Sequence, residues 1–308
     1  MINYFKKVNP LVLVLLLILI SGCSNDDSQT PDTAQDAQEE TVAEPTEENT
    51  EETTEETTEE STEETTDETQ AGLSLRLATD GDYGKILVNG ENQSIYFFAG
   101  DVTGESNCNG GCADVWPALT GELSELELGE GLDYADFHTT EREDGQKQLT
   151  YKGWPLYYFS TEGDRVLEAP GETLGDGRGG LFHIAKPDYS ILLGRQTVTE
   201  GEEPVVYLVD DRGVSLYTNT GDDENSSNCA GGCAGVWPPF KTPEKLVVAS
   251  SLSLDDFYTN DREDDLGPQL AFQKSPLYFF SQDEGKRGSV LGQAGGPNQT
   301  FFVAEPEE

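Results

Sequence analysis

Basic residues and histidines are scarce in this sequence. Its 308 residues include 18 lysines and arginines against 60 aspartates and glutamates, which gives a formal net charge of −42, and only two histidines. A surface this negative repels nucleic acid and anionic lipid headgroups. The composition therefore argues against DNA or RNA as a partner, and it leaves cations, a basic partner or solubility at high salt open.

Catalytic signatures are also missing from the sequence. It contains no recognisable Ser/His/Asp order and no metal-binding histidine pair, and the glycine-rich run 175–180 lacks the lysine of a phosphate loop, so we interpret it as a turn. A haem attachment site needs histidine directly after the second cysteine, where Ala113 and Ala234 stand. His138 and His183 are far apart and are not repeated. We therefore predict no catalytic residue, no metal site, no cofactor and no enzymatic activity.

The sequence has no long hydrophobic run. Its apolar stretch Leu11–Ile20 has ten residues, too few to span a bilayer core of about 30 Å. It follows Lys6-Lys7 and precedes Ile20-Ser21-Gly22-Cys23, a tetrapeptide that resembles a bacterial lipobox. We expect residues 1–22 to be a lipoprotein signal peptide and Cys23 to be acylated, so that the lipid bilayer is one partner of the mature protein.

The residues after Cys23 predict where the protein is held. Ser24 resembles the sorting residue of outer-membrane lipoproteins, and Asn25-Asp26-Asp27 resembles an acidic surface-export signal. Residues 24–72 then contain 19 acidic and no basic residues, with almost nothing apolar, so they cannot bury enough surface to offset chain entropy. We expect residues 23–71 to be a disordered acidic Glu/Thr linker, and the protein to be lipid-anchored in a bacterial cell envelope, at the outer membrane and exposed on the surface.

One stretch of the remaining sequence occurs twice. The copies run from Tyr96 to Pro117 and from Tyr217 to Pro238, and Tyr, Asp, both Cys, Trp and Pro recur at one offset without a gap. Such self-similarity is typical of a duplicated unit. We predict two tandem β-repeat domains, residues 72–187 and 188–308; the alternative is one interleaved domain such as a small propeller or barrel.

The pattern of short runs predicts an all-β fold, with each copy a small β-rich unit of sandwich or barrel type. Short alternating or aromatic runs are broken by Gly, Asn and Asp, and a sustained helical period is missing except in a short helix expected near Leu123–Leu128. The expected hairpins and single strands are Lys85–Val88 with Ser94–Phe98, Gln148–Lys152 with Pro155–Ser160, Val205–Val209 with Ser215–Thr218, Gln269–Gln273 with Pro276–Ser281, Leu181–Ala185 and Phe301–Ala304.

The repeated residues have structural explanations that need no ligand. In a strand, Tyr96 and Phe98 point to one face and bury a large apolar area, while Asp101 falls past the strand end, where its carboxylate can accept hydrogen bonds from turn amides. Proline fixes φ, so Trp-Pro can pin a loop onto a core. The candidate motif residues, whose role is left unassigned, are Tyr96, Phe98, Asp101, Trp116, Pro117, Tyr157, Phe159, His183, Tyr217, Asp222, Trp237, Pro238, Tyr278, Phe280 and Asp283.

These residues resemble a known family. The Tyr-x-aromatic-x-x-Asp element, the Cys-x-x-x-Cys before Trp-Pro and the run from Gln148 to Tyr157 look like bacterial lipoproteins with a Yx(FWY)xxD motif, a secreted repeat of unknown function. The resemblance implies an envelope location and tandem repeats, without an established activity. In the first copy Glu162 replaces the second motif Asp, and in the second copy Phe302 stands where His183 stands in the first.

The four remaining cysteines form two local pairs. With Cys23 acylated, an oxidising compartment favours the disulfides Cys108–Cys112 and Cys229–Cys233, and the glycines between them supply the freedom that so tight a ring requires. A zinc site shared by the four thiols and a redox-active pair are the alternatives. We therefore expect a non-enzymatic binding or structural lipoprotein with an unknown envelope or extracellular partner; the alternative is an extracytoplasmic redox or electron-transfer protein.

Overall fold

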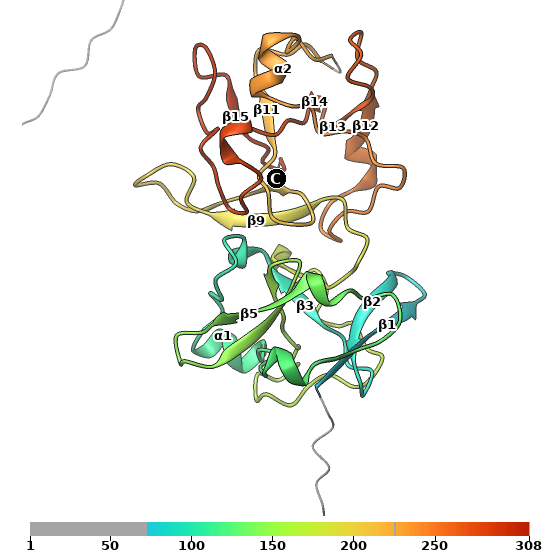
Figure 1. Cartoon of the computed structure of the whole chain (residues 1–308). Helices are drawn as coiled ribbons and strands as arrows, with labels where there is room; N and C mark the ends of the chain where they lie inside the picture. The colour runs from blue at the N-terminus through green and yellow to red at the C-terminus, as the bar shows by residue number, and fades with distance from the viewer. Residues whose placement is uncertain (1–72, 225, 308) are drawn as a thin grey trace, which may run out of the picture. The chain divides into compact units, whose positions relative to one another are not determined.

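The computed structural model describes residues 73–224 and 226–307, which belong to one compact unit, Thr65–Glu308 (Figure 1). The expected signal peptide, the acylation site Cys23 and the linker 23–71 lie outside the described residues. Within the described residues no helix is both long enough and apolar enough to cross a membrane.

Strands dominate the described residues, as the sequence predicts. The strands are β1 Ser74–Asp80, β2 Gly84–Asn89, β3 Tyr96–Phe98, β4 Glu127–Leu128, β5 Phe137–Glu141, β6 Lys147–Tyr151, β7 Trp154–Pro155, β8 Phe182–Ile184, β9 Leu192–Gln196, β10 Val205–Val209, β11 Tyr217–Asn219, β12 Phe257–Asn260, β13 Gln269–Phe272, β14 Ser275–Pro276 and β15 Phe301–Val303. The helices are short: α1 Gly111–Val115 and α2 Gly232–Val236, with 3₁₀ turns at Ala99–Asp101, Leu123–Glu125, Tyr134–Asp136, Arg178–Gly180, Leu254–Asp256 and Ser281–Asp283.

The two copies have matching sheets. In the first, β1 pairs with β2 and β4, β3 with β8, and β5, β6 and β7 form an antiparallel sheet. In the second, β9 pairs with β10, β11 with β15, and β12, β13 and β14 form the equivalent sheet. Each sheet has only two or three strands among the described residues. The sandwich or barrel architecture of each copy remains a prediction. So does the division of the chain into domains at residue 187.

Alternating residues of the first copy face two different apolar clusters. Ile86, Val88 and Tyr96 belong to a cluster confined to the first copy, whereas Leu87 and Phe97 belong to a larger one. Because successive side chains of a strand point to opposite faces, both faces of these strands are covered, which explains why Ile86, Leu87 and Val88 are all buried. The larger cluster contains residues of both copies, so the two copies share part of their core.

Half-buried contacts join the copies. The Arg287 side chain donates to the carbonyls of Val102 (2.9 Å) and Lys152 (3.3 Å), and its guanidinium lies 4.7 Å from the ring centroid of Trp154. Lys152 Nζ lies 2.7 Å from Asp211 Oδ2. Arg287 and Trp154 have no equivalents in the other copy, where Ser275 stands in place of Trp154, so the internal repeat gave no signal for this junction.

Three local predictions are wrong. The helix expected at Leu123–Leu128 is a 3₁₀ turn followed by strand β4, because Leu128 pairs in parallel with Leu75. The hairpin expected between 85–88 and 94–98 is reduced to a bridge between Val88 and Ser94, since β2 takes β1 as its partner and β3 takes β8. The hairpin expected between 205–209 and 215–218 is likewise reduced to a bridge between Val209 and Ser215, since β10 takes β9 as its partner and β11 takes β15.

Candidate functional site

The motif tyrosines of each copy pair with one another. Tyr96 and Tyr157 form an antiparallel bridge in which each backbone N–H donates to the carbonyl of the other, at 2.8 and 3.0 Å. Tyr217 and Tyr278 form the same bridge in the second copy, with both bonds at 2.9 Å. Each copy thus contains two motif elements, related by a local antiparallel pairing. Tyr157 and Tyr278 begin these second elements.

Each motif tyrosine donates to a carboxylate supplied by the opposite element of its copy. Tyr157 donates to Asp101 Oδ2 at 2.6 Å, and Tyr278 donates to Asp222 Oδ2 at 2.6 Å. Tyr217 donates in turn to Asp283 Oδ2 at 2.7 Å, so the exchange in the second copy is reciprocal. The motif aspartate is therefore the hydrogen-bond acceptor that locks the two elements of a copy together.

In the first copy, Glu168 rather than Glu162 is the carboxylate that accepts the second tyrosine hydrogen bond. Tyr96 donates to Glu168 Oε1 at 2.5 Å, and Glu168 Oε2 accepts from the backbone N–H of Leu174 at 2.8 Å. Asp283 accepts in the same way from the backbone N–H of Leu291. Glu162 is exposed. The prediction that Glu162 replaces the second motif aspartate is wrong, because the chain carries Glu168, from a later position in the loop, to the Tyr96 hydroxyl and leaves Glu162 exposed.

A buried arginine joins the motif to the disulfide loop of the first copy. Arg142 Nη1 donates to Ser106 Oγ (2.6 Å) and to Gln148 Oε1 (2.7 Å), and its Nη2 donates to the Cys108 carbonyl (2.9 Å). Ser106 Oγ lies 2.9 Å from the hydroxyl of Tyr157, the tyrosine bound to the motif aspartate. The guanidinium thus links the strand sheet, the motif and the first cysteine in one network.

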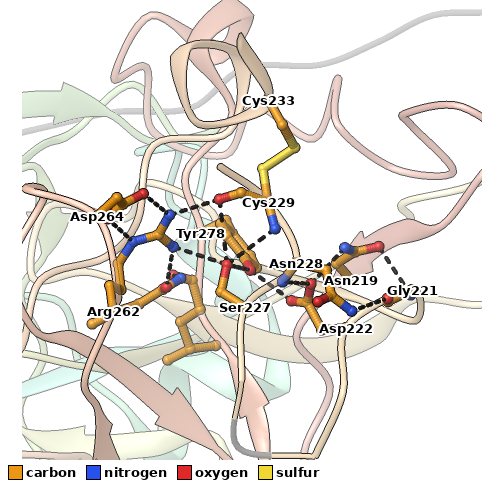
Figure 2. The surroundings of a disulfide bond; sticks show 12 residues. Asn219, Gly221, Asp222, Ser227, Asn228, Cys229, Cys233, Arg262, Asp264 and Tyr278 are labelled. Atoms are coloured by element: carbon orange, nitrogen blue, oxygen red, sulfur yellow. Dashed lines mark hydrogen bonds and ion pairs between the residues drawn. A yellow bond between two sulfur atoms is a disulfide. The ribbon is translucent and has the colours of Figure 1, made fainter. Parts of the chain in front are cut away.

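Figure 2 shows the equivalent network of the second copy. Arg262 donates to Ser227 Oγ (2.8 Å), Gln269 Oε1 (2.7 Å) and the Cys229 carbonyl (2.6 Å). Unlike Arg142, it also forms a two-pronged ion pair with Asp264, at 2.6 and 2.8 Å. The equivalent Asp144 of the first copy lies 3.9 Å from Arg142. Such bidentate carboxylate pairs are among the stronger polar contacts in proteins.

Both cysteine pairs are disulfide-bonded, Cys108 to Cys112 and Cys229 to Cys233. Cys108 and Cys229 are buried, whereas Cys112 and Cys233 are half-buried. The second cysteine of each pair lies in a five-residue helix, α1 or α2, and its carbonyl accepts from the backbone N–H of the following tryptophan at 2.8 Å. Each disulfide therefore closes the loop between the motif aspartate and the buried tryptophan.

The tryptophans anchor aromatic cores. Trp116 stacks on Phe182 with ring centroids 3.7 Å apart and meets the edge of Tyr96 at 5.5 Å. In the second copy Trp237 stacks on Phe301 at 3.7 Å and packs against Tyr217 and Phe280. Phe98 and Phe159 join the first cluster. The Pro117 and Pro238 carbonyls accept from the backbone N–H of the residue after the motif tyrosine, both at 2.8 Å, which fixes the Trp-Pro corner.

The two histidines lie in different environments. His183, on β8 opposite Phe97, is 2% exposed, and its Nδ1 lies 3.4 Å from Ser250 Oγ of the second copy. Its Nε2 is buried without a hydrogen-bond partner among the described residues. Burial lowers the His183 pKa to about 4, although the nearby Asp176 opposes this shift. His138 is exposed on β5. The structure does not bring the two together.

The electrostatics of the motif reflect burial. Burial raises the pKa of Asp101 to about 7 and of Glu168 to about 7, against the smaller opposing effects of their hydrogen bonds. Burial also raises the pKa of Tyr96, Tyr157, Tyr217 and Tyr278. The tyrosines are therefore neutral donors at physiological pH. Within residues 73–224 and 226–307 no group of three or more His, Cys, Asp and Glu side chains could hold a metal ion.

Loss of one disulfide should weaken the fold without abolishing it. Replacing Cys108 and Cys112 with serine is expected to cost about 2 kcal/mol, the loop-closure entropy of so short a ring, which lowers the melting temperature by about 4–8 °C. The circular dichroism spectrum should stay of β type, because the backbone carbonyl at position 108, which accepts from Arg142, is unchanged by the substitution. The double Cys229→Ser/Cys233→Ser variant is the matched comparison. Loss of the β spectrum in either variant would contradict this prediction.

Sequence reasoning missed the polar residues that support the motif. Arg142, Gln148 and Ser106 recur as Arg262, Gln269 and Ser227, at nearly the same offset as the cysteines. Asn107 and Asn228 donate their backbone N–H to the motif aspartates at 2.7 and 2.9 Å. The recurrence of these polar residues in both copies is the signal that could have identified them.

Comparison with known proteins finds repeats that are shorter than the duplicated unit. Residues 78–120, 138–186 and 207–241 each match the Lipoprotein_15 family model, a secreted repeat of unknown function. The expectation of two repeats is thus corrected to three matched repeats, because the first duplicated unit contains two of them. The strands β12–β15 of the second copy lie beyond the matched residues, although they pair as β5–β8 do. No curated protein and no solved structure matches the chain.

The buried Tyr–carboxylate exchange recurs in both copies, and the matched segments contain the motif tyrosines Tyr96, Tyr157 and Tyr217. The chain belongs to the Lipoprotein_15 family of secreted repeats.

Proposed function

We propose that this protein is a lipid-anchored envelope protein whose repeats form a rigid, non-enzymatic binding or structural module. One observation carries the proposal: the motif tyrosines Tyr96, Tyr157, Tyr217 and Tyr278 are all fully buried, and each hydroxyl donates to a carboxylate of its own copy. A buried polar group that is already paired stabilises the fold and is not available to a substrate. The motif residues therefore support the fold, and a partner binds to other residues on the surface of the repeats.

The membrane attachment in this proposal rests on the lipobox-like tetrapeptide that ends at Cys23. The two disulfides and the secreted family support a location outside the cytoplasm. We place the acylated protein at the outer membrane with its repeats on the cell surface. There the acidic linker holds the repeats away from the lipid, and an envelope or extracellular component other than nucleic acid is the partner.

Acylation is testable directly. Cells that express the protein should incorporate labelled palmitate into it, and the Cys23→Ala variant should lose the label and become soluble, because the acyl chains supply the anchor. A Cys108→Ser/Cys112→Ser variant, which keeps Cys23, is the control and should still be labelled. Membrane retention of the unlabelled Cys23→Ala protein would contradict the anchor, and complete protection from protease added to intact cells would contradict the surface location.

The non-enzymatic assignment has a separate test. Protein isolated from its own cells should show only the ultraviolet absorption of its aromatic side chains and no band in the visible range. A bound chromophore would favour the alternative, an extracytoplasmic redox protein.

A further inference from the structure

The sequence contains two Asn-Gly pairs, Asn89-Gly90 and Asn109-Gly110, and the structure treats them differently. In such a pair the backbone nitrogen after the asparagine can attack the side-chain amide carbon, since glycine has no side chain to obstruct the approach. The second copy has Ala230-Gly231 where the first has Asn109-Gly110. A reaction at Asn109 would therefore affect one copy only.

The Asn89 side chain is held away from this reaction. Its Oδ1 accepts from the backbone N–H groups of Glu91 (3.1 Å) and Gln93 (2.9 Å), and its Nδ2 donates to Gln93 Oε1 (2.9 Å). Turning this amide toward the Gly90 nitrogen breaks all three hydrogen bonds. Asn89 is therefore a protected reference within the same protein.

Asn109 lies in an open and chemically activated position. Gly110 is exposed, a side chain added there would meet nothing within 4 Å, and its backbone N–H has no hydrogen-bond partner among the described residues. Arg142 Nη2 donates to Asn109 Oδ1 at 3.0 Å, while Asn109 Nδ2 makes only a long bond, 3.3 Å, to the Ser106 carbonyl. A cation on the carbonyl oxygen stabilises the negative charge that develops there when a nucleophile attacks the carbon.

We propose that Asn109 is a site of spontaneous deamidation activated by Arg142. The Gly110 nitrogen forms a bond to Asn109 Cγ, its proton passes to solvent, and the Cγ–Nδ2 bond breaks with release of ammonia. Water then opens the resulting cyclic imide to aspartate or isoaspartate. The net change is the hydrolysis of an amide to a carboxylate and ammonium, with no oxidant or reductant.

The product completes the arginine site of the first copy. Arg262 already has a carboxylate partner in Asp264 at 2.6 Å, whereas Asp144 is 3.9 Å from Arg142. A carboxylate at position 109 would replace a neutral acceptor of Arg142 with a charged one, and charge-assisted bonds are the stronger kind. The modification therefore adds one negative charge at the disulfide loop of the first copy.

The test follows both asparagines in one sample. Folded protein is incubated at about pH 8 and physiological temperature, reduced and digested, and the mass increase of amide-to-acid conversion is measured for the two peptides. We expect Asn109 to convert more than about tenfold faster than Asn89, because only Asn89 must break three hydrogen bonds to react. In urea the two rates should become similar.

Two outcomes would overturn the proposal. One is conversion of Asn109 no faster than Asn89 in the folded protein, and the other is an equal preference for Asn109 in urea, which would show that the fold has no part in it. The Arg142→Lys variant, checked for a native circular dichroism spectrum, should slow Asn109 severalfold and leave Asn89 unchanged. An unchanged rate of Asn109 deamidation in the folded Arg142→Lys variant would show that Arg142 does not activate the reaction. Should the variant fail to fold, the comparison with urea remains decisive.

Discussion

Replacing Arg287 with alanine is expected to destabilise the repeat region by about 3 kcal/mol, a fall in melting temperature of about 6–12 °C. Its half-buried side chain donates to the carbonyls of Val102 and Lys152 and packs over Trp154. Truncation leaves these carbonyls without their donor and removes the packing of the long side chain. Thermal unfolding followed by tryptophan fluorescence measures the effect, because unfolding exposes the buried tryptophan rings to water.

Arg212 supplies the matched control for this prediction. It also reaches from the second copy to the first, where its Nη2 lies 3.1 Å from Asp136 Oδ1, but its side chain is 58% exposed. Exposed ion pairs contribute about 0–1 kcal/mol to the free energy of unfolding, so the Arg212→Ala variant should have a melting temperature close to that of the wild type. Equal melting temperatures for the two variants would show that the Arg287 contacts do not hold the copies together.

The protein is expected to be more stable at about pH 6 than at about pH 8, by about 2 kcal/mol. Burial raises the pKa of Asp101 and Glu168 to about 7 and of Asp210 to about 6, above their unfolded values near 4. The folded state keeps these protons where the unfolded chain has lost them, so stability falls as the pH rises from about 4 to 7. His183 acts oppositely: its pKa is lowered to about 4, and its contribution is lost as the pH falls below about 6.5.

Variants of two glutamates distinguish the burial of carboxyl groups from general charge repulsion as the cause of this pH dependence. Glu168→Gln should reduce the stability difference between about pH 6 and pH 8 by about half, since the amide cannot ionise. Glu162→Gln, an exposed neighbour at the expected motif position, should leave the difference unchanged. Denaturant unfolding of the three proteins at both pH values measures it. An equal reduction in both variants would mean that net charge, rather than burial of Glu168, sets the pH dependence.

The sequence by itself determined the repeated elements of this protein. Alternation of apolar residues predicted strands near β2, β6, β10 and β13, and the recurring Cys and Trp-Pro residues indicated the disulfide loops and the aromatic cores. These features are local, because a strand face, a five-residue ring and a proline corner are each set by neighbours along the chain. Recurrence at one offset also indicated which residues share a structural position in the two copies.

Only the tertiary structure decided which residues meet. Each motif tyrosine donates to a carboxylate of the opposite motif element, as Tyr217 does to Asp283. In the first copy Glu168 rather than Glu162 accepts from Tyr96, because the path of the loop brings Glu168 to that hydroxyl. Arg142 and Arg262 are not among the motif residues identified from the sequence, yet each side chain is buried against a cysteine carbonyl. The Arg287 contacts join residues far apart in the chain that occur once only. Periodicity and repetition carry no information about such unique long-range contacts, since packing of the whole chain selects them.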